Sequence, residues 1–246
     1  MDFCAVLQNT VACFDGFRMK STGKRAEFAE PSPTDGIRVD LRLIGTLIEP
    51  GARVLDVGCG DGSLLRYLVE KKGVDGRGLE ISPAGVRKCL RQGLSVVQGD
   101  ADTDLKNYPT GAFDYIVLSE TLQTTHNPIV VLRELVRIGH FAIVSFPNFG
   151  YWHCRWQLLV HGRMPVTKNL PLPWYATPNI HFSTISDFAE TCREERIEIV
   201  RSYAVNQRGT LGRFFGARVF ANLFGAQGVF LLAATSAQRD DESKGA

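Results

Sequence analysis

The chain has 246 residues, of which 44% are hydrophobic and 22% are charged, and its 28 Lys and Arg barely outnumber its 26 Asp and Glu. This balance is ordinary for one large α/β domain and lacks the basic excess typical of nucleic-acid-binding proteins. No apolar run reaches the roughly 18 residues needed to cross a bilayer, and the first residues carry no basic segment, so we expect neither a membrane span nor a signal peptide.

The cysteines are scattered and include no C-x-x-C pair: Cys4, Cys13, Cys59, Cys89, Cys154 and Cys192. A zinc site is therefore not expected, and the sequence predicts no metal. Scattered single cysteines are typical of reduced thiols, which indicates a cytoplasmic protein. Residues 1–35 show weak periodicity and end in the breaker-rich stretch EPSPTDG. We expect a flexible N-terminal extension there, followed by one domain over residues 36–246.

Helices and strands are predicted to alternate after this extension. Val39, Leu43, Ile44 and Leu47 share one face of a helix over residues 39–48. The predicted strands are short apolar runs and span residues 53–58, 76–81, 94–99, 113–119, 140–147, 197–205 and 228–235. The predicted helices between them span residues 62–71, 82–93, 128–138 and 185–195. This alternation favours right-handed crossovers and a mostly parallel sheet, whereas residues 150–182, rich in aromatic residues and proline, interrupt it.

The stretch RVLDVGCGDG at residues 53–62 places three glycines directly after the first strand. A tight turn is one explanation, and a ligand lying against the main chain is another. The dinucleotide pattern G-x-G-x-x-G is not met, because Ser63 stands where the third glycine belongs. With Asp56 before the turn and a helix N-terminus after it, the pattern favours a ligand with an amino-acid end: its ammonium at Asp56 and its carboxylate at the turn.

Polar residues also end the next three predicted strands. Glu80, followed by Ile81, ends the second, where a carboxylate accepts hydrogen bonds from both ribose hydroxyls. After the third strand, Asp100 suits the exocyclic amine of an adenine, and Ala101 suits the same ring through its main chain. Residues 119–122, after the fourth strand, would cover the other side of the ligand. Together these elements favour an adenosine ligand with an amino-acid end over a structural turn.

The segments VLDVGCGDG, LEI and GDAD resemble the class I S-adenosylmethionine-dependent methyltransferases over residues 40–148. The resemblance implies a Rossmann-like, mostly parallel seven-stranded sheet with helices on both faces and a final antiparallel hairpin. It also implies S-adenosylmethionine as cofactor. The cofactor-binding residues that we expect are Asp56, Gly58, Cys59, Gly60, Gly62, Glu80, Ile81, Asp100, Ala101, Ser119 and Leu122.

A closer resemblance extends over residues 37–236. The segments GRMPVTKNLP and PNIHF, with those above, are similar to the MetW family of methionine biosynthesis proteins. This implies a cytoplasmic protein that works beside homoserine O-acyltransferase. Two functions stay open: a partner that supports the acyltransferase and binds S-adenosylmethionine, and a methyltransferase that acts on a small molecule.

A methyltransferase needs a base only when its acceptor must lose a proton. The candidates are His126, His153 and His181, and His181 is preferred because it follows a proline-rich segment where a lid would lie. Asn148 and Trp152, just after the fifth strand, are expected to line an acceptor pocket. No N-P-P-Y follows the fourth strand, so an amide or base nitrogen loses support as the acceptor.

Overall fold

The computed structural model describes residues 38–206, 211–212 and 218–234. The predicted extension over residues 1–35 lies outside them. The strands of the sheet are β1 (Arg53–Val57), β2 (Asp75–Glu80), β3 (Ser95–Gln98), β4 (Phe113–Ser119), β5 (Gly139–Pro147), β6 (Ile197–Val205), β7 (Leu211–Gly212) and β8 (Gln227–Ala234). The helices are α2 (Val39–Leu47), α3 (Ser63–Lys72), α4 (Pro83–Arg91), α5 (Pro128–Ile138), α6 (Trp152–His161), α7 (Ile185–Glu194) and α8 (Arg218–Phe224), with 3-10 turns η1 (Leu105–Asn107) and η2 (Leu122–Thr124).

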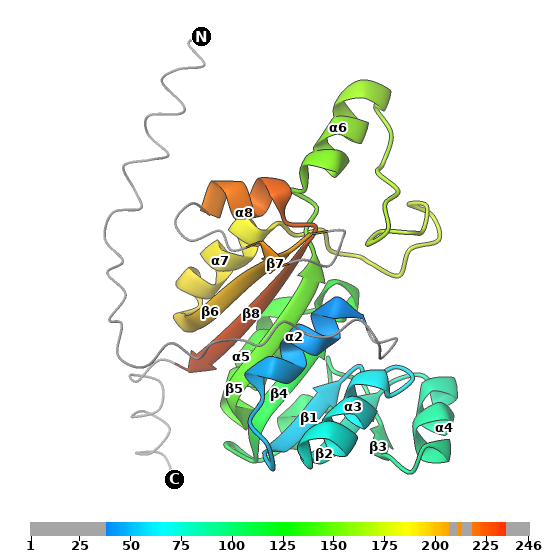
Figure 1. The fold of residues 1–246 in the computed structure, drawn as a ribbon, viewed down its shortest axis with the longest axis vertical. Coiled ribbons are helices and arrows are strands. Elements are labelled where there is room, and N and C mark those ends of the chain that lie inside the picture. The colour runs from blue at the N-terminus through cyan, green and yellow to red at the C-terminus, as the bar shows by residue number, and fades with distance from the viewer. Residues whose placement is uncertain (1–37, 207–210, 213–217, 235–246) are drawn as a thin grey trace. The chain divides into compact units, whose positions relative to one another are not determined.

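The strands form one sheet in the order β3-β2-β1-β4-β5-β8-β6-β7 (Figure 1). Strands β1 to β5 are parallel, and β8 runs antiparallel between β5 and β6. The predicted Rossmann-like architecture is confirmed, with seven main strands and a terminal antiparallel hairpin. The two-residue β7 pairs with the end of β6 and adds an eighth strand that the sequence did not predict.

Helices cover both faces of the sheet because the strands are apolar on both faces. On one face, Ile44 of α2 and Leu68 of α3 pack with Val54 and Val117. On the other, α5 and α7 pack over alternate strand residues, and a stack of three aromatic rings fills the centre: Phe146, Phe188 and Phe230. Two cores of this kind keep the strand ends in fixed register.

The strand tips that matter lie side by side. Val57 at the end of β1 pairs with Leu79 of β2 on one side and with Leu118 of β4 on the other. Glu80 pairs with Gln98 at the end of β3. The turns that follow β1 to β4 therefore meet at one edge of the sheet, which is where open parallel sheets bind ligands.

Two helices differ from the sequence expectations. The sequence predicts no helix or strand within residues 150–182, yet α6 forms near their start. No helix is predicted between β6 and β8, yet α8 forms there. Of the residues of α6 only Cys154 is buried, so the helix does not pack an apolar face onto either large core.

Candidate functional site

The turn after β1 depends on left-handed backbone at three alternate residues. Gly58, Gly60 and Gly62 have φ angles of 72°, 58° and 79°. Other residues rarely adopt these angles, which explains the glycines. The turn is held against β2 by a hydrogen bond of 2.7 Å from the Gly58 N–H to the Leu79 carbonyl. A Cβ on Gly60 would meet no atom within 4 Å, so the main chain at Gly60 borders open space, whereas a Cβ on Gly58 or Gly62 would lie within 2.5 Å of a side chain.

Glu80 connects this turn with the start of α4. One carboxylate oxygen accepts the N–H of Gly60 at 2.7 Å, and the other accepts the N–H of Ser82 at 2.8 Å. The close approach of α4 depends on Gly85, because a Cβ there would lie 2.7 Å from the Gly60 carbonyl oxygen. Ile81, beside Glu80, is exposed. Glu80 is thus fixed in place before any ligand arrives.

Asp56 is the electrostatically unusual residue of the site. Only 2% of its surface is exposed, and no hydrogen bond to its carboxylate is found within the described residues. Burial, together with the negative charge of Glu80, raises the pKa of Asp56 to about 7. A buried carboxylate without a partner is costly unless a cation or a proton neutralises it.

Cys59 contributes its main chain to the turn and its side chain to the core. The thiol packs with Leu65, Cys89 and Leu94, and its sulfur lies 3.9 Å from that of Cys89. Burial raises the pKa of the Cys59 thiol, which keeps it protonated. Cys59 is one of the residues that we expect to bind the cofactor, but only its main-chain atoms are available to a ligand at the strand tips.

The turn after β3 is tied to the segment after β4. Asp100 accepts the N–H of Asp102 at 2.9 Å, and Asp102 in turn accepts the backbone N–H groups of His126 and Asn127. Ala101 is half-buried against the apolar core cluster that contains Leu122. Sequence reasoning did not identify Asp102, although its position two residues after Asp100 suits a turn-closing carboxylate.

The tip of β4 carries Ser119 and a charged network that the sequence did not reveal. The Ser119 hydroxyl lies 3.1 Å from that of Ser145 on β5. The next residue, Glu120, has a φ of 51° and forms an ion pair of 2.8 Å with Arg38, which also pairs with Asp40. Gln227 donates hydrogen bonds to both acids, which are Asp40 and Glu120. Asp40, Glu120 and Gln227 come from distant parts of the chain, so no local pattern links them.

The amide of Asn148 is fully occupied by the main chain. Its nitrogen donates to the carbonyls of Asn222 and Gly225, both at 2.7 Å. Its oxygen accepts the N–H groups of Gly150 and Ile185. No hydrogen-bonding atom of this buried side chain is left for a substrate, which favours a structural role over the expected place in an acceptor pocket.

His181 and Trp152 lie on separate segments. His181 is exposed and lines a hollow with Leu122, Gln123 and Phe188. The backbone N–H groups of Ile180 and His181 both donate to the Gln123 carbonyl. Trp152 begins α6 and is also exposed. All three candidate side chains belong to the described chain, and no hydrogen bond joins them to one another.

Two further observations concern the described residues as a whole. Within them, no three His, Cys, Asp or Glu side chains gather as a metal site would require. The helices of the same residues are all too short or too polar to traverse a bilayer.

Solved structures with a similar fold include methyltransferases and a [4+2]-cyclase. A methyltransferase of Thermotoga maritima, titled a possible histamine N-methyltransferase, is 18% identical with a TM-score of 0.58 and matches 80% of this chain and 88% of its own. A methyltransferase of Archaeoglobus fulgidus is 15% identical with a TM-score of 0.56 and matches 78% and 90% of the two chains. At such low identity these matches establish the fold alone.

Curated relatives are more similar in sequence but match only in part. The bifunctional methionine biosynthesis protein MetXA/MetW of Rhodopirellula baltica is 34% identical over 160 residues, which are 61% of this chain and 26% of the relative. A ubiquinone biosynthesis O-methyltransferase of Xanthomonas oryzae is 36% identical over 93 residues, 36% of this chain and 38% of the enzyme. The chain thus spans well under half the length of these relatives.

The family model described as methionine biosynthesis protein MetW matches residues 38–232. This match covers β1 to β7 and most of β8, both segments GRMPVTKNLP and PNIHF, and all the strand-tip residues described above. The chain therefore belongs to the MetW family of methionine biosynthesis proteins.

Proposed function

We propose that this protein binds S-adenosylmethionine across the tips of β1 to β4 and, in that role, supports a homoserine O-acyltransferase. The observation that carries the cofactor proposal is the buried Asp56 carboxylate, which has no hydrogen-bond partner among the described residues and stands close to the bare main chain of Gly60. A ligand that brings its own positive charge supplies what this carboxylate lacks.

The residues present fit this cofactor. The ammonium of its methionine part would pair with Asp56. The ribose hydroxyls would donate to Glu80, whose two oxygens each accept one N–H and retain a lone pair. The adenine would lie between Ile81 and the Ala101–Leu122 wall, within reach of Asp100. When bound, the cofactor supplies an electrophilic methyl group on its sulfonium.

Support for the acyltransferase partner comes from the comparisons. The Rhodopirellula relative is named as a bifunctional MetXA/MetW protein, and the aligned part is 26% of its length. Most of that relative therefore lies outside the part similar to this chain and can carry the MetXA function. A MetW-like part fused to another enzyme of the same pathway suggests that the two act in contact.

Two measurements test the proposal separately. Isothermal titration calorimetry of the full chain with S-adenosylmethionine should show saturable heat, and no heat would overturn the cofactor assignment. Acyl transfer to homoserine should be slower when the chain is omitted from an assay that contains the acyltransferase of the same organism. Equal rates with and without the chain would overturn the partner assignment.

A second candidate function is methyl transfer to a small molecule. The hollow lined by Leu122, Gln123 and His181 favours it, because the buried Gln123 amide has no hydrogen-bond partner within the part of the chain that the structure describes. In this alternative, His181 accepts the acceptor's proton while the apolar walls exclude water. Release of S-adenosylhomocysteine in the presence of cell extract, lost in His181→Ala, would support it; no release above the uncatalysed rate would contradict it.

A further inference from the structure

Helix α6 turns its apolar stripe toward solvent. Trp152, Trp156, Leu159 and Val160 follow the i, i+4, i+7, i+8 spacing of a single helix face, and all four are exposed. Leu159 is 80% exposed. In a helix packed onto a domain core, a stripe with this spacing faces inward. Here it faces away from the domain that carries it.

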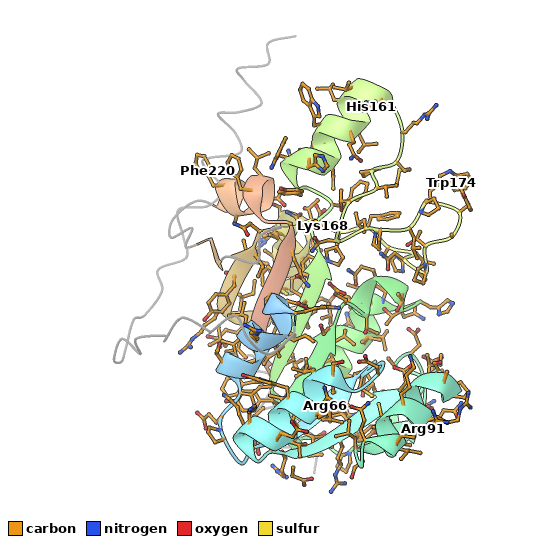
Figure 2. The ribbon with its side chains drawn as sticks, turned by 45° about the vertical axis from the view of Figure 1, so that its right-hand side comes forward. Arg66, Arg91, His161, Lys168, Trp174 and Phe220 are labelled. Atoms are coloured by element: carbon orange, nitrogen blue, oxygen red, sulfur yellow. The ribbon has the colours of Figure 1, made fainter. Side chains whose placement is uncertain are left out.

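The opposite side of α6 meets only a small cluster. Cys154 packs there with Tyr151, Leu170 and Ala226, away from the two large cores. Figure 1 shows α6 standing out beyond the sheet, and Figure 2 shows His161 at its far end. The described part of the chain therefore offers the stripe no covering element.

The exposed apolar surface continues through the loop after α6. We call residues 152–182 the aromatic arm. Beyond α6 its exposed apolar side chains are Met164, Val166, Leu172, Trp174, Tyr175, Ile180 and Phe182. Trp174 points outward at the outer edge of the loop in Figure 2. A hollow lined by Phe149, Met164, Leu172 and Phe182 opens within the arm. Exposed aromatic residues around a pocket are typical of the anchor points of protein interfaces.

The charge of the arm has one sign. Between Glu134 and Asp187 the sequence contains no Asp or Glu, while Arg155, Arg163 and Lys168 lie within the arm. Two copies of the chain that met face to face through this surface would bring like charges together. An apolar surface with an acidic rim on another protein is its complement.

We infer that the aromatic arm is the docking surface for the homoserine O-acyltransferase. This inference rests on the proposed function, and it adds the surface and the chemistry of the partner face: an apolar patch rimmed by carboxylates. The relative that carries both names in one chain supports such a lasting contact. The arm lies wholly within the residues that the family model matches.

The arm also returns to the cofactor edge. The N–H groups of Ile180 and His181 donate to the carbonyl of Gln123 at 2.9 and 3.1 Å, one residue from Leu122. A partner held by the arm would therefore contact a segment bonded to the tip of β4. This places the docking surface next to the part of the chain that we assign to the adenine.

The test compares two identical substitutions in the full chain. Leu159→Glu puts a charge in the stripe, and the matched control Leu90→Glu changes a leucine of α4 that is 55% exposed. Binding of each variant to the purified acyltransferase of the same organism is measured by biolayer interferometry. We expect Leu159→Glu to raise Kd at least about tenfold and Leu90→Glu to leave it unchanged. Arg163→Glu should slow association and weaken its dependence on salt.

The outcomes separate this inference from the proposed function. If the unmodified chain does not bind the acyltransferase, the partner assignment itself fails. If it binds and Leu159→Glu binds equally well, the arm is not the docking surface, although the partner assignment stands. Loss of a chain dimer, or of sedimentation with vesicles of anionic phospholipid, in Leu159→Glu with unchanged acyltransferase binding would likewise overturn the inference. Thermal melting and cofactor titration of both variants verify that the fold is intact.

Discussion

The carboxylate of Glu80 accepts the backbone N–H of Gly60 over 2.7 Å and thereby joins the tip of β2 to the turn after β1. Its second oxygen holds the N–H of Ser82 at the start of α4. A hydrogen bond to a charged acceptor is stronger than one between neutral groups. The ribose-binding group and the turn that we assign to the methionine part are thus one connected unit, oriented before a ligand binds.

Replacing Glu80 should therefore remove binding and orientation together. We expect Glu80→Ala to weaken S-adenosylmethionine binding about 30-fold or more, because hydrogen bonds to a charged group contribute on the order of 2 kcal/mol. Glu80→Gln should lose less, since its amide oxygen still accepts one N–H. Calorimetry measures both, with Glu198→Ala on the surface of β6 as control. Unchanged affinity in Glu80→Ala would contradict the ribose assignment.

Gly60 allows a sharper comparison, because the chain offers a matched glycine elsewhere. Gly60 and Gly73 have φ angles of 58° and 61°, and a Cβ at either would meet no atom within 4 Å. Valine should therefore cost similar backbone strain at both, on the order of 1–2 kcal/mol. Only Gly60→Val fills the space assigned to the cofactor, so only it should abolish binding in calorimetry. If Gly60→Val still binds the cofactor, or if Gly73→Val loses binding equally, the turn after β1 does not lie against the cofactor.

The strand tips could be predicted from sequence because their signals are local. A glycine turn after an apolar strand, then Glu80 and Asp100 at the ends of the next two strands, requires only that consecutive parallel strands end at one edge. The Asp40–Glu120–Gln227 network could not be predicted in this way, since its members lie up to 187 positions apart and meet only through the sheet order.

The residues that line a pocket for the methyl acceptor were harder to predict, because a residue type does not reveal its hydrogen-bond partners. Asn148 follows β5, where a pocket residue is plausible, but its amide joins four main-chain groups from three segments. Helix α6 was not predicted, for a different reason. Its apolar stripe has a helical period, yet the aromatic and proline-rich surroundings dominate the pattern, and the stripe faces solvent.

Asn148→Ala distinguishes a structural role from a catalytic one. The substitution leaves the carbonyls of Asn222 and Gly225 and two N–H groups without partners in a buried place. We expect a loss of about 3 kcal/mol in the free energy of unfolding, measured by urea denaturation. Affinity for S-adenosylmethionine at a temperature where the variant is folded should stay unchanged. A stable variant with impaired methyl transfer would favour the catalytic assignment instead.

Asp56 makes the stability of the ligand-free protein depend on pH. Its pKa is about 7 in the folded chain, against about 3.9 when unfolded, so the folded state binds a proton more tightly. The resulting stabilisation is fully present below about pH 4 and lost as pH rises to about 7, and it amounts to roughly 4 kcal/mol. In urea denaturation, the free energy of unfolding of Asp56→Asn should increase relative to that of the unmodified protein as the pH rises across this range. Curves that stay parallel for the two proteins would contradict the raised pKa of Asp56 in the folded state.

The same carboxylate should make cofactor binding depend on pH in the opposite direction. An ammonium pairs with the ionised form of Asp56, so affinity for S-adenosylmethionine should rise between pH 5.5 and 7.5 as the carboxyl loses its proton. Binding near neutral pH should then release a proton, which calorimetry detects as heat that varies with the ionisation enthalpy of the buffer. Asp56→Asn should bind more weakly and show neither the pH slope nor the proton release. If the variant keeps the slope, another group near the ligand titrates, and the ammonium does not lie at Asp56.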